Sequence, residues 1–97
     1  MTPLGFKRSL SKSEPPSDVS PALAGLWWAA NNDWDKAHKL VMDENSVESA
    51  WVHAYLHRVE GDLANARYWY RQAHRPSAEG GLPDEWDAIV AALLQSK

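Results

Sequence analysis

Residues 50–73 read AWVHAYLHRVEGDLANARYWYRQA, and this stretch predicts two helices joined at the turn Glu60-Gly61-Asp62. Gly61 has no Cβ and can adopt the left-handed conformation that ends a helix. Asp62 can then accept hydrogen bonds from the first free amides of the next helix, and its charge suits the positive end of that helix. The stretch is therefore an antiparallel helix hairpin, and it indicates an all-α fold.

Both helices of this hairpin carry apolar side chains at helical spacing. In the first helix they cover roughly two thirds of a helical wheel stepped at about 100° per residue, so this helix is expected to pack on more than one side. These residues are Ala50, Trp51, Val52, Ala54, Tyr55, Leu56 and Val59. In the second helix Leu63, Ala66, Tyr70 and Ala73 recur at helical spacing. The alanines permit a close approach of neighbouring helices.

A second pair of helices is expected upstream. Ser20 followed by Pro21 is a helix start signal, because serine caps a helix and proline suits its first position. That helix runs to about Ala30, and Asp33 then caps the next one. The inward stripe of the second helix consists of Trp34, Ala37, His38 and Val41.

The later helix boundaries follow from similar signals. Asn45, with Glu48 three residues later, forms a capping-box pattern that opens the third helix. Pro76 ends the fourth helix, and Pro83 opens a fifth with a single apolar face. The sequence thus predicts five helices, the last of which caps a helical stack.

Residues 1–19 differ in composition from the rest of the chain. Serine, proline and charged residues dominate them without a sustained period, so they are expected to form a disordered tail before a domain at 20–97. Phe6, between Leu4 and Leu10, leaves a short docking motif as the alternative.

Composition argues against several classes of function. The 97 residues carry a formal net charge of −3, which argues against a dedicated binder of nucleic acid or of an anionic membrane. The chain has no cysteine, which excludes disulfides, thiolate catalysis and cysteine-type zinc sites. No apolar run approaches the roughly 18 residues of a membrane span, and the N-terminus has no signal-peptide core. We therefore expect one cytoplasmic domain without nucleic-acid or membrane partners.

The two predicted hairpins align with each other at an offset of 29 residues. The second hairpin resembles a tetratricopeptide (TPR) repeat in the spacing of Gly61-Asp62, Ala66, Tyr70 and Ala73. This resemblance covers about residues 20–76 and implies a right-handed, TPR-like stack of antiparallel helix hairpins. The stretches from Trp34 to His38 and from His53 to Asp62 also resemble a group of small uncharacterised microbial proteins, which implies no function.

The TPR resemblance implies a non-catalytic protein-interaction module. Its partner would be an unknown protein or peptide, and self-association into a homo-oligomer is one way to complete so small a groove. The candidate binding residues are Trp51, Tyr55, Arg58, Tyr68 and Arg71.

Arg58 stands out because it falls inside the apolar arc of its helix. A guanidinium there must be paired or stacked, either with an internal carboxylate, Asp62 or Glu60, or with a ligand. Arg67, Arg71 and Arg75 instead form a ridge at i, i+4 and i+8, which is either a solvated face or a surface for an acidic protein patch.

The histidines give a second hypothesis, a small metal- or ligand-binding protein. His53, His57 and Glu60 are spaced i, i+4 and i+7, which can bind an ion such as Zn²⁺ through two imidazoles and a carboxylate. His38 on the neighbouring helix can add a ligand. The helical wheel turns His53 and His57 toward solvent, whereas the TPR alignment turns them into the packing between helices.

An enzyme of unrecognised type is the third hypothesis. A histidine paired with a carboxylate can act as a general base. However, the sequence has no nucleophile elbow, phosphate-binding loop or glycine-rich nucleotide turn. We therefore name no catalytic residue.

Overall fold

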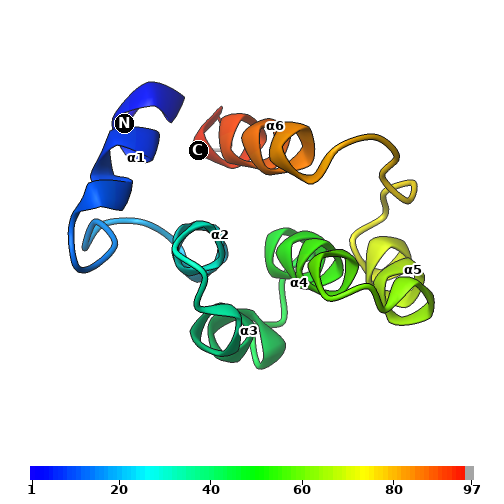
Figure 1. Ribbon diagram of the computed structural model, residues 1–97. Helices are drawn as coiled ribbons and strands as arrows, with labels where there is room; N and C mark the ends of the chain where they lie inside the picture. The colour runs from blue at the N-terminus through cyan, green and yellow to red at the C-terminus, as the bar shows by residue number, and fades with distance from the viewer. Residues whose placement is uncertain (96–97) are drawn as a thin grey trace.

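The computed structural model describes residues 1–95, and within them the chain is all-helical, with no strand (Figure 1). The all-α prediction is confirmed. The helices are α1 (Pro3–Arg8), α2 (Pro21–Ala30), α3 (Trp34–Met42), α4 (Val47–Val59), α5 (Leu63–Gln72) and α6 (Leu82–Gln95). A short 3-10 helix, Ser9–Ser11, continues α1.

The helices α2 to α5 form two hairpins with turns of similar construction. Asn32 and Gly61 both adopt positive φ angles, of 63° and 86°. The side chains of the next residues, Asp33 and Asp62, each accept a hydrogen bond from the amide three residues later. Both aspartate amides also donate to the carbonyl five residues earlier, at 2.9 Å. These turns repeat the 29-residue spacing of the sequence.

Close packing of α2 depends on Gly25. A Cβ at this position would lie 3.1 Å from Cγ1 of Val41 on α3 and 3.4 Å from Cγ1 of Val52 on α4. Contacts this short leave little room for any larger residue. The absence of a side chain therefore lets α2 approach α3 and α4 together.

Helix α6 lies across α2 and α4 and contacts both of them (Figure 1). Trp86 donates its indole N–H to the Leu26 carbonyl at 2.8 Å, and Ile89 and Val90 are fully buried. The narrow apolar face of α6 thus closes the main core over the two inner helices.

Residues 3–11 correct the expectation of a disordered tail over residues 1–19. They form α1 and the 3-10 helix, and Phe6 is completely buried. The indole N–H of Trp27 donates to the Ser9 hydroxyl at 3.1 Å. The buried ring of Phe6 thus anchors a segment whose average composition is polar. The chain therefore has six helices within its described residues, and the prediction of five was wrong.

Two predicted helix starts are shifted by one residue. Ser46 caps α4 by accepting a hydrogen bond from the Ser49 amide at 3.1 Å, whereas Asn45 was the predicted cap. Helix α6 begins at Leu82, one residue before the predicted Pro83. None of the helices in residues 1–95 combines the length and the apolar character needed to cross a membrane.

Candidate metal centre

Three histidines from two helices meet between α3 and α4. His38 lies on α3, and His53 and His57 lie on α4. One ring nitrogen from each lies within 4.8 Å of the other two, and the Nε2 atoms of His38 and His53 are 3.0 Å apart. We call these three residues the histidine cluster.

Local geometry explains how the cluster forms. His53 and His57 are one helical turn apart, and their rings stack with centroids 4.9 Å apart. His38 faces them from α3, which packs against this side of α4. His53 and His57 are only 4% and 6% exposed, so they lie in the helix packing, where the repeat alignment placed them. The solvent-facing orientation suggested by the helical wheel was wrong.

Two tryptophans hold the imidazole rings from outside the cluster. Trp34 stacks on His38 at 4.7 Å between centroids, and Trp69 of α5 stacks on His53 at 3.9 Å. The indole N–H of Trp34 donates to the Leu56 carbonyl at 2.7 Å, which fixes that ring. Trp34 was predicted to share the inward stripe with His38, but neither tryptophan was predicted to belong to the site. The spacing of Trp34 one turn before His38 was an available signal.

Glu60 belongs to the surroundings of the cluster rather than to the three-nitrogen set. Its Oε1 lies 2.6 Å from Nδ1 of His57, and its side chain is 38% exposed. It groups with His57 and Asp62, not with His38 and His53. Of the four predicted metal ligands, the structure thus brings together the three histidines and places the carboxylate behind one of them.

Burial keeps two of the imidazoles neutral. Burial, and then the proximity of His38 and His57, lowers the pKa of His53 to about 4. The pKa of His38 is also lowered, mainly by burial and then by His57, against the opposing effect of Glu60 and Asp35. A neutral imidazole offers a lone pair, which is the form that binds a metal ion.

The hydrogen bonds of the cluster are incomplete. Nδ1 of His53 is buried and has no partner among the described residues. The contact between the Nε2 atoms of His38 and His53 needs one donor and one acceptor, so one proton serves both atoms. A buried polar group without a partner costs about 1–3 kcal/mol. The cluster therefore contains a buried ring nitrogen, Nδ1 of His53, whose hydrogen-bonding capacity no group of the described residues uses.

The five residues predicted to bind a peptide do not lie on one open surface. Tyr55 is buried, and the half-buried Trp51 is covered by the guanidinium of Arg75, 3.5 Å from its ring centroid. Tyr68 and Arg71 are exposed on α5. Of the predicted arginine ridge, Arg75 therefore packs its guanidinium on an aromatic ring while it remains exposed to solvent.

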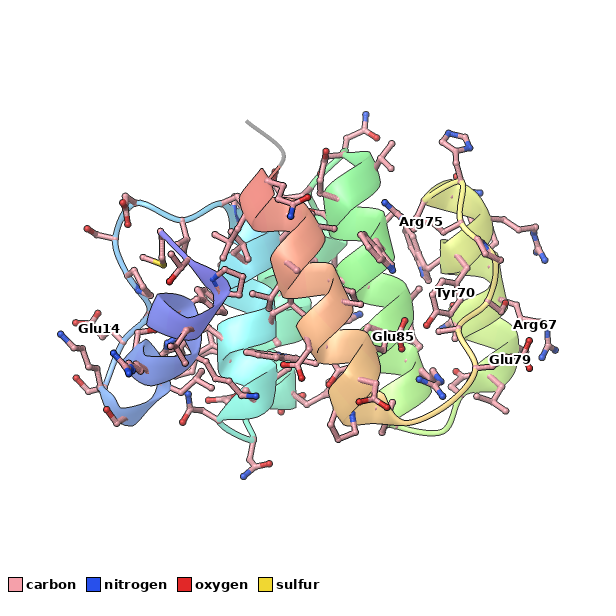
Figure 2. The ribbon with its side chains drawn as sticks, turned by 90° about the horizontal axis from the view of Figure 1, so that it is seen from above. Glu14, Arg67, Tyr70, Arg75, Glu79 and Glu85 are labelled. Atoms are coloured by element: carbon pink, nitrogen blue, oxygen red, sulfur yellow. The ribbon has the colours of Figure 1, made fainter. Side chains whose placement is uncertain are left out.

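Arg58, the fifth of these residues, is paired within the chain. Its Nη1 donates to Oε1 of Glu85 at 2.9 Å. The Tyr70 hydroxyl donates to the other oxygen of the same carboxylate, and Figure 2 shows Tyr70 and Glu85 side by side. Burial, and then the contact with Glu85, raises the pKa of Tyr70. The expected partners were Asp62 and Glu60, which was wrong. The actual partner lies on α6, beyond the reach of helical spacing arguments. We call Arg58, Tyr70 and Glu85 the carboxylate network.

A cavity of about 450 Å³ lies away from both groups of residues, at the N-terminal ends of α2 and α4. Its lining includes Asp18, Glu44 and Glu48 but none of the histidines. The histidine cluster is therefore the only one of these features that combines burial, lowered pKa values and converging donor atoms.

Comparison of the chain with protein-family models, with curated proteins and with solved structures found no match in any of the three searches.

Proposed function

We propose that the protein binds one divalent transition-metal ion through His38, His53 and His57. The convergence of three imidazole nitrogens carries this proposal. Nitrogen ligands at about 2.0–2.1 Å from a tetrahedral Zn²⁺ ion are separated by about 3.3–3.4 Å. The facing Nε2 atoms, at 3.0 Å, are within a few tenths of an ångström of that separation.

The donor set also selects the class of metal. Imidazole nitrogens suit Zn²⁺, Cu²⁺ and Ni²⁺, whereas Mg²⁺ and Ca²⁺ prefer oxygen ligands. The three histidines supply three ligands, so a four-coordinate ion would take its remaining ligand from outside this set. The ion would join α3 of one hairpin to α4 of the next, and it would stabilise the folded chain by binding it in preference to the unfolded chain.

A thermal melt of the full chain tests this function. Samples are compared with EDTA, without additions and with Zn²⁺, and bound metal is measured in each. At a hundredfold excess over the dissociation constant, binding to the native state adds about 2.7 kcal/mol of stability. For a chain of this size that corresponds to a rise in Tm on the order of 10 °C.

Two variants make the test specific. His53→Leu removes one proposed ligand with little change in volume. His74→Asn removes the fourth histidine of the chain, which is exposed and outside the cluster. Asparagine tolerates the positive φ of 58° at that position. The Zn²⁺ shift should persist in His74→Asn and disappear in His53→Leu, and an equal shift in both variants would contradict the proposal.

We also infer that α2 to α5 pack as a TPR-like pair of hairpins. The equivalent turns and the close approach at Gly25 support this inference. Because α6 covers α2 and α4, a protein-interaction function would use the outer face of α5, where Leu63 and Tyr68 are 55% and 46% exposed beside Arg71.

For this second function we propose that the partner is a second copy of the chain. Sedimentation should then show a dimer that Tyr68→Ala weakens, while exposed Glu79→Ala leaves it unchanged. A monomer at all concentrations would reject the homo-oligomer.

A further inference from the structure

His57 differs from the other two histidines of the cluster because a carboxylate contacts it. Nδ1 of His57 and Oε1 of Glu60 are 2.6 Å apart, within the range of a charge-assisted hydrogen bond. Glu60 is the residue at the C-terminal cap of α4, and its own amide donates to the Leu56 carbonyl at 3.2 Å. The end of the helix therefore fixes the backbone that carries this carboxylate.

The contact determines where the proton of His57 lies. An ionised carboxylate only accepts hydrogen bonds, so Nδ1 of the imidazole must carry the hydrogen. A neutral imidazole has a single N–H, which leaves a lone pair on Nε2. The His57 side chain is only 8% exposed, so water competes less for this hydrogen bond than it would at an exposed histidine.

His38 and His53 have no such partner. Their Nε2 atoms face each other at 3.0 Å and share one proton, while Nδ1 of His53 has no partner in the described part of the chain. A metal ion that binds Nε2 of both rings displaces this proton, which then moves to Nδ1 of the ring that carried it, so that both imidazoles stay neutral. One of these two rings must therefore change tautomer on binding, whereas His57 is already in the required form.

We propose that Glu60 is a positioning residue of the metal centre, which holds His57 as the Nδ1–H tautomer and presents its Nε2 to the ion. This inference rests on the proposed metal-binding function. It assigns Glu60 a role behind the ligand in place of the ligand role that the sequence suggested. Partners of this kind typically change metal affinity by about 10–100-fold when they are removed.

The first test uses the metal-free protein, so that its outcome does not depend on metal binding. Nitrogen-15 chemical shifts of the histidine rings report which nitrogen carries the proton. In the wild-type chain with EDTA, His57 should show a single Nδ1–H tautomer. Glu60→Ala should convert it to a mixture, and Glu79→Ala, which removes another exposed carboxylate, should leave it unchanged.

The second test measures Zn²⁺ affinity by competition with a chelator. Glu60→Ala should raise the dissociation constant by about 10–100-fold. The metal-free Tm should change little, because Glu60 is partly exposed and makes one side-chain contact. A merely structural role would lower the Tm and leave the affinity of the folded protein unchanged.

The two tests separate failure of the function from failure of the inference. A wild-type chain that binds no Zn²⁺ but has the fixed tautomer rejects the metal function and, with it, Glu60 as a positioning residue. A chain that binds Zn²⁺ equally well with and without Glu60, or that shows His57 as a tautomer mixture in the wild type, rejects the inference about Glu60 alone.

Discussion

The chain buries two polar groups of residues, and they differ in how fully their atoms are paired. In the carboxylate network, both oxygens of Glu85 accept hydrogen bonds, one from Arg58 and one from Tyr70. In the histidine cluster, Nδ1 of His53 has no partner among residues 1–95. Buried polar groups are normally paired, so an unpaired one calls for an explanation.

This difference is why we propose a structural role for the carboxylate network and a binding role for the histidine cluster. The carboxylate network joins α4, α5 and α6, and it uses its hydrogen-bonding capacity within the chain. The histidine cluster brings ring nitrogens together where α3 meets α4, and one of its buried nitrogens has no partner within residues 1–95. The proposed metal ion would bind the Nε2 atoms that converge in the cluster, whereas the network has little left to offer a ligand.

Breaking the carboxylate network should produce the largest effect. Glu85→Ala removes the acceptor of the buried Tyr70 hydroxyl and the carboxylate partner of the largely buried Arg58 guanidinium, which keeps its hydrogen bond to the Gly80 carbonyl. Removal of one partner from a buried charged pair costs about 3–5 kcal/mol. Urea denaturation should show this loss without any change in bound Zn²⁺ per folded chain. A loss below about 1 kcal/mol would mean that the network is not structural.

Acid should destabilise the metal-free protein through the histidine cluster. The pKa of His53 is about 4 in the folded chain and 6.5 in its reference state. Below pH 6.5 the unfolded chain therefore binds a proton that the folded chain does not, and stability falls until the pH reaches about 4. The shift corresponds to at most about 3 kcal/mol.

The matched control for this pH dependence is His53→Leu. Urea midpoints are compared between pH 7 and pH 4.5 in EDTA for both chains. The decrease should be smaller in the variant, because its unfolded state has one fewer group to protonate. Equal decreases in the two chains would show that His53 is not held neutral.

At neutral pH, His53→Leu should raise the stability of the metal-free chain and abolish Zn²⁺ binding, which would distinguish the histidine cluster from the carboxylate network. Leucine removes the unpaired Nδ1, while the half-buried His38 can bond to water. We expect the metal-free variant to be more stable than the wild type by about 0.5–2 kcal/mol. Equilibrium dialysis should show that Zn²⁺ binding is lost. A strongly destabilised variant would indicate that the cluster is a structural core.

Removing an exposed ion pair should change the free energy of unfolding least, and this change gives a reference for the larger ones. Lys7 Nζ and Asp87 Oδ1 are 3.4 Å apart, with side chains 58% and 53% exposed. Asp87→Asn should change the free energy of unfolding by less than about 0.5 kcal/mol, because water screens such pairs. Urea denaturation at low salt measures it. A change comparable with that of Glu85→Ala would undermine the distinction between exposed and buried polar groups.

Local signals explain why the helix pattern could be predicted. The turn at Gly61 and Asp62 and the start at Ser20 and Pro21 involve neighbouring residues only, and they occur where the sequence predicts them. The helix at residues 3–11 could not be predicted in this way. Its order depends on Phe6, which is buried by segments far along the chain.

In the candidate site, too, the features within one helix could be predicted and the contacts between helices could not. The spacing of His53 and His57 already placed them on one face of a helix, because four residues make about one turn. Their meeting with His38 depends on how α3 packs on α4, and the pairing of Arg58 with Glu85 depends on where α6 lies. No periodicity within one helix specifies these long-range contacts.

X-ray absorption at the zinc edge of the Zn²⁺-loaded chain tests the central claim most directly, since it counts the imidazoles around the ion. The account predicts one ion per chain with three histidine nitrogens at about 2.0–2.1 Å, and loss of that signal in His53→Leu but not in His74→Asn. A chain that retains no zinc, or an ion surrounded mainly by oxygen, would contradict it.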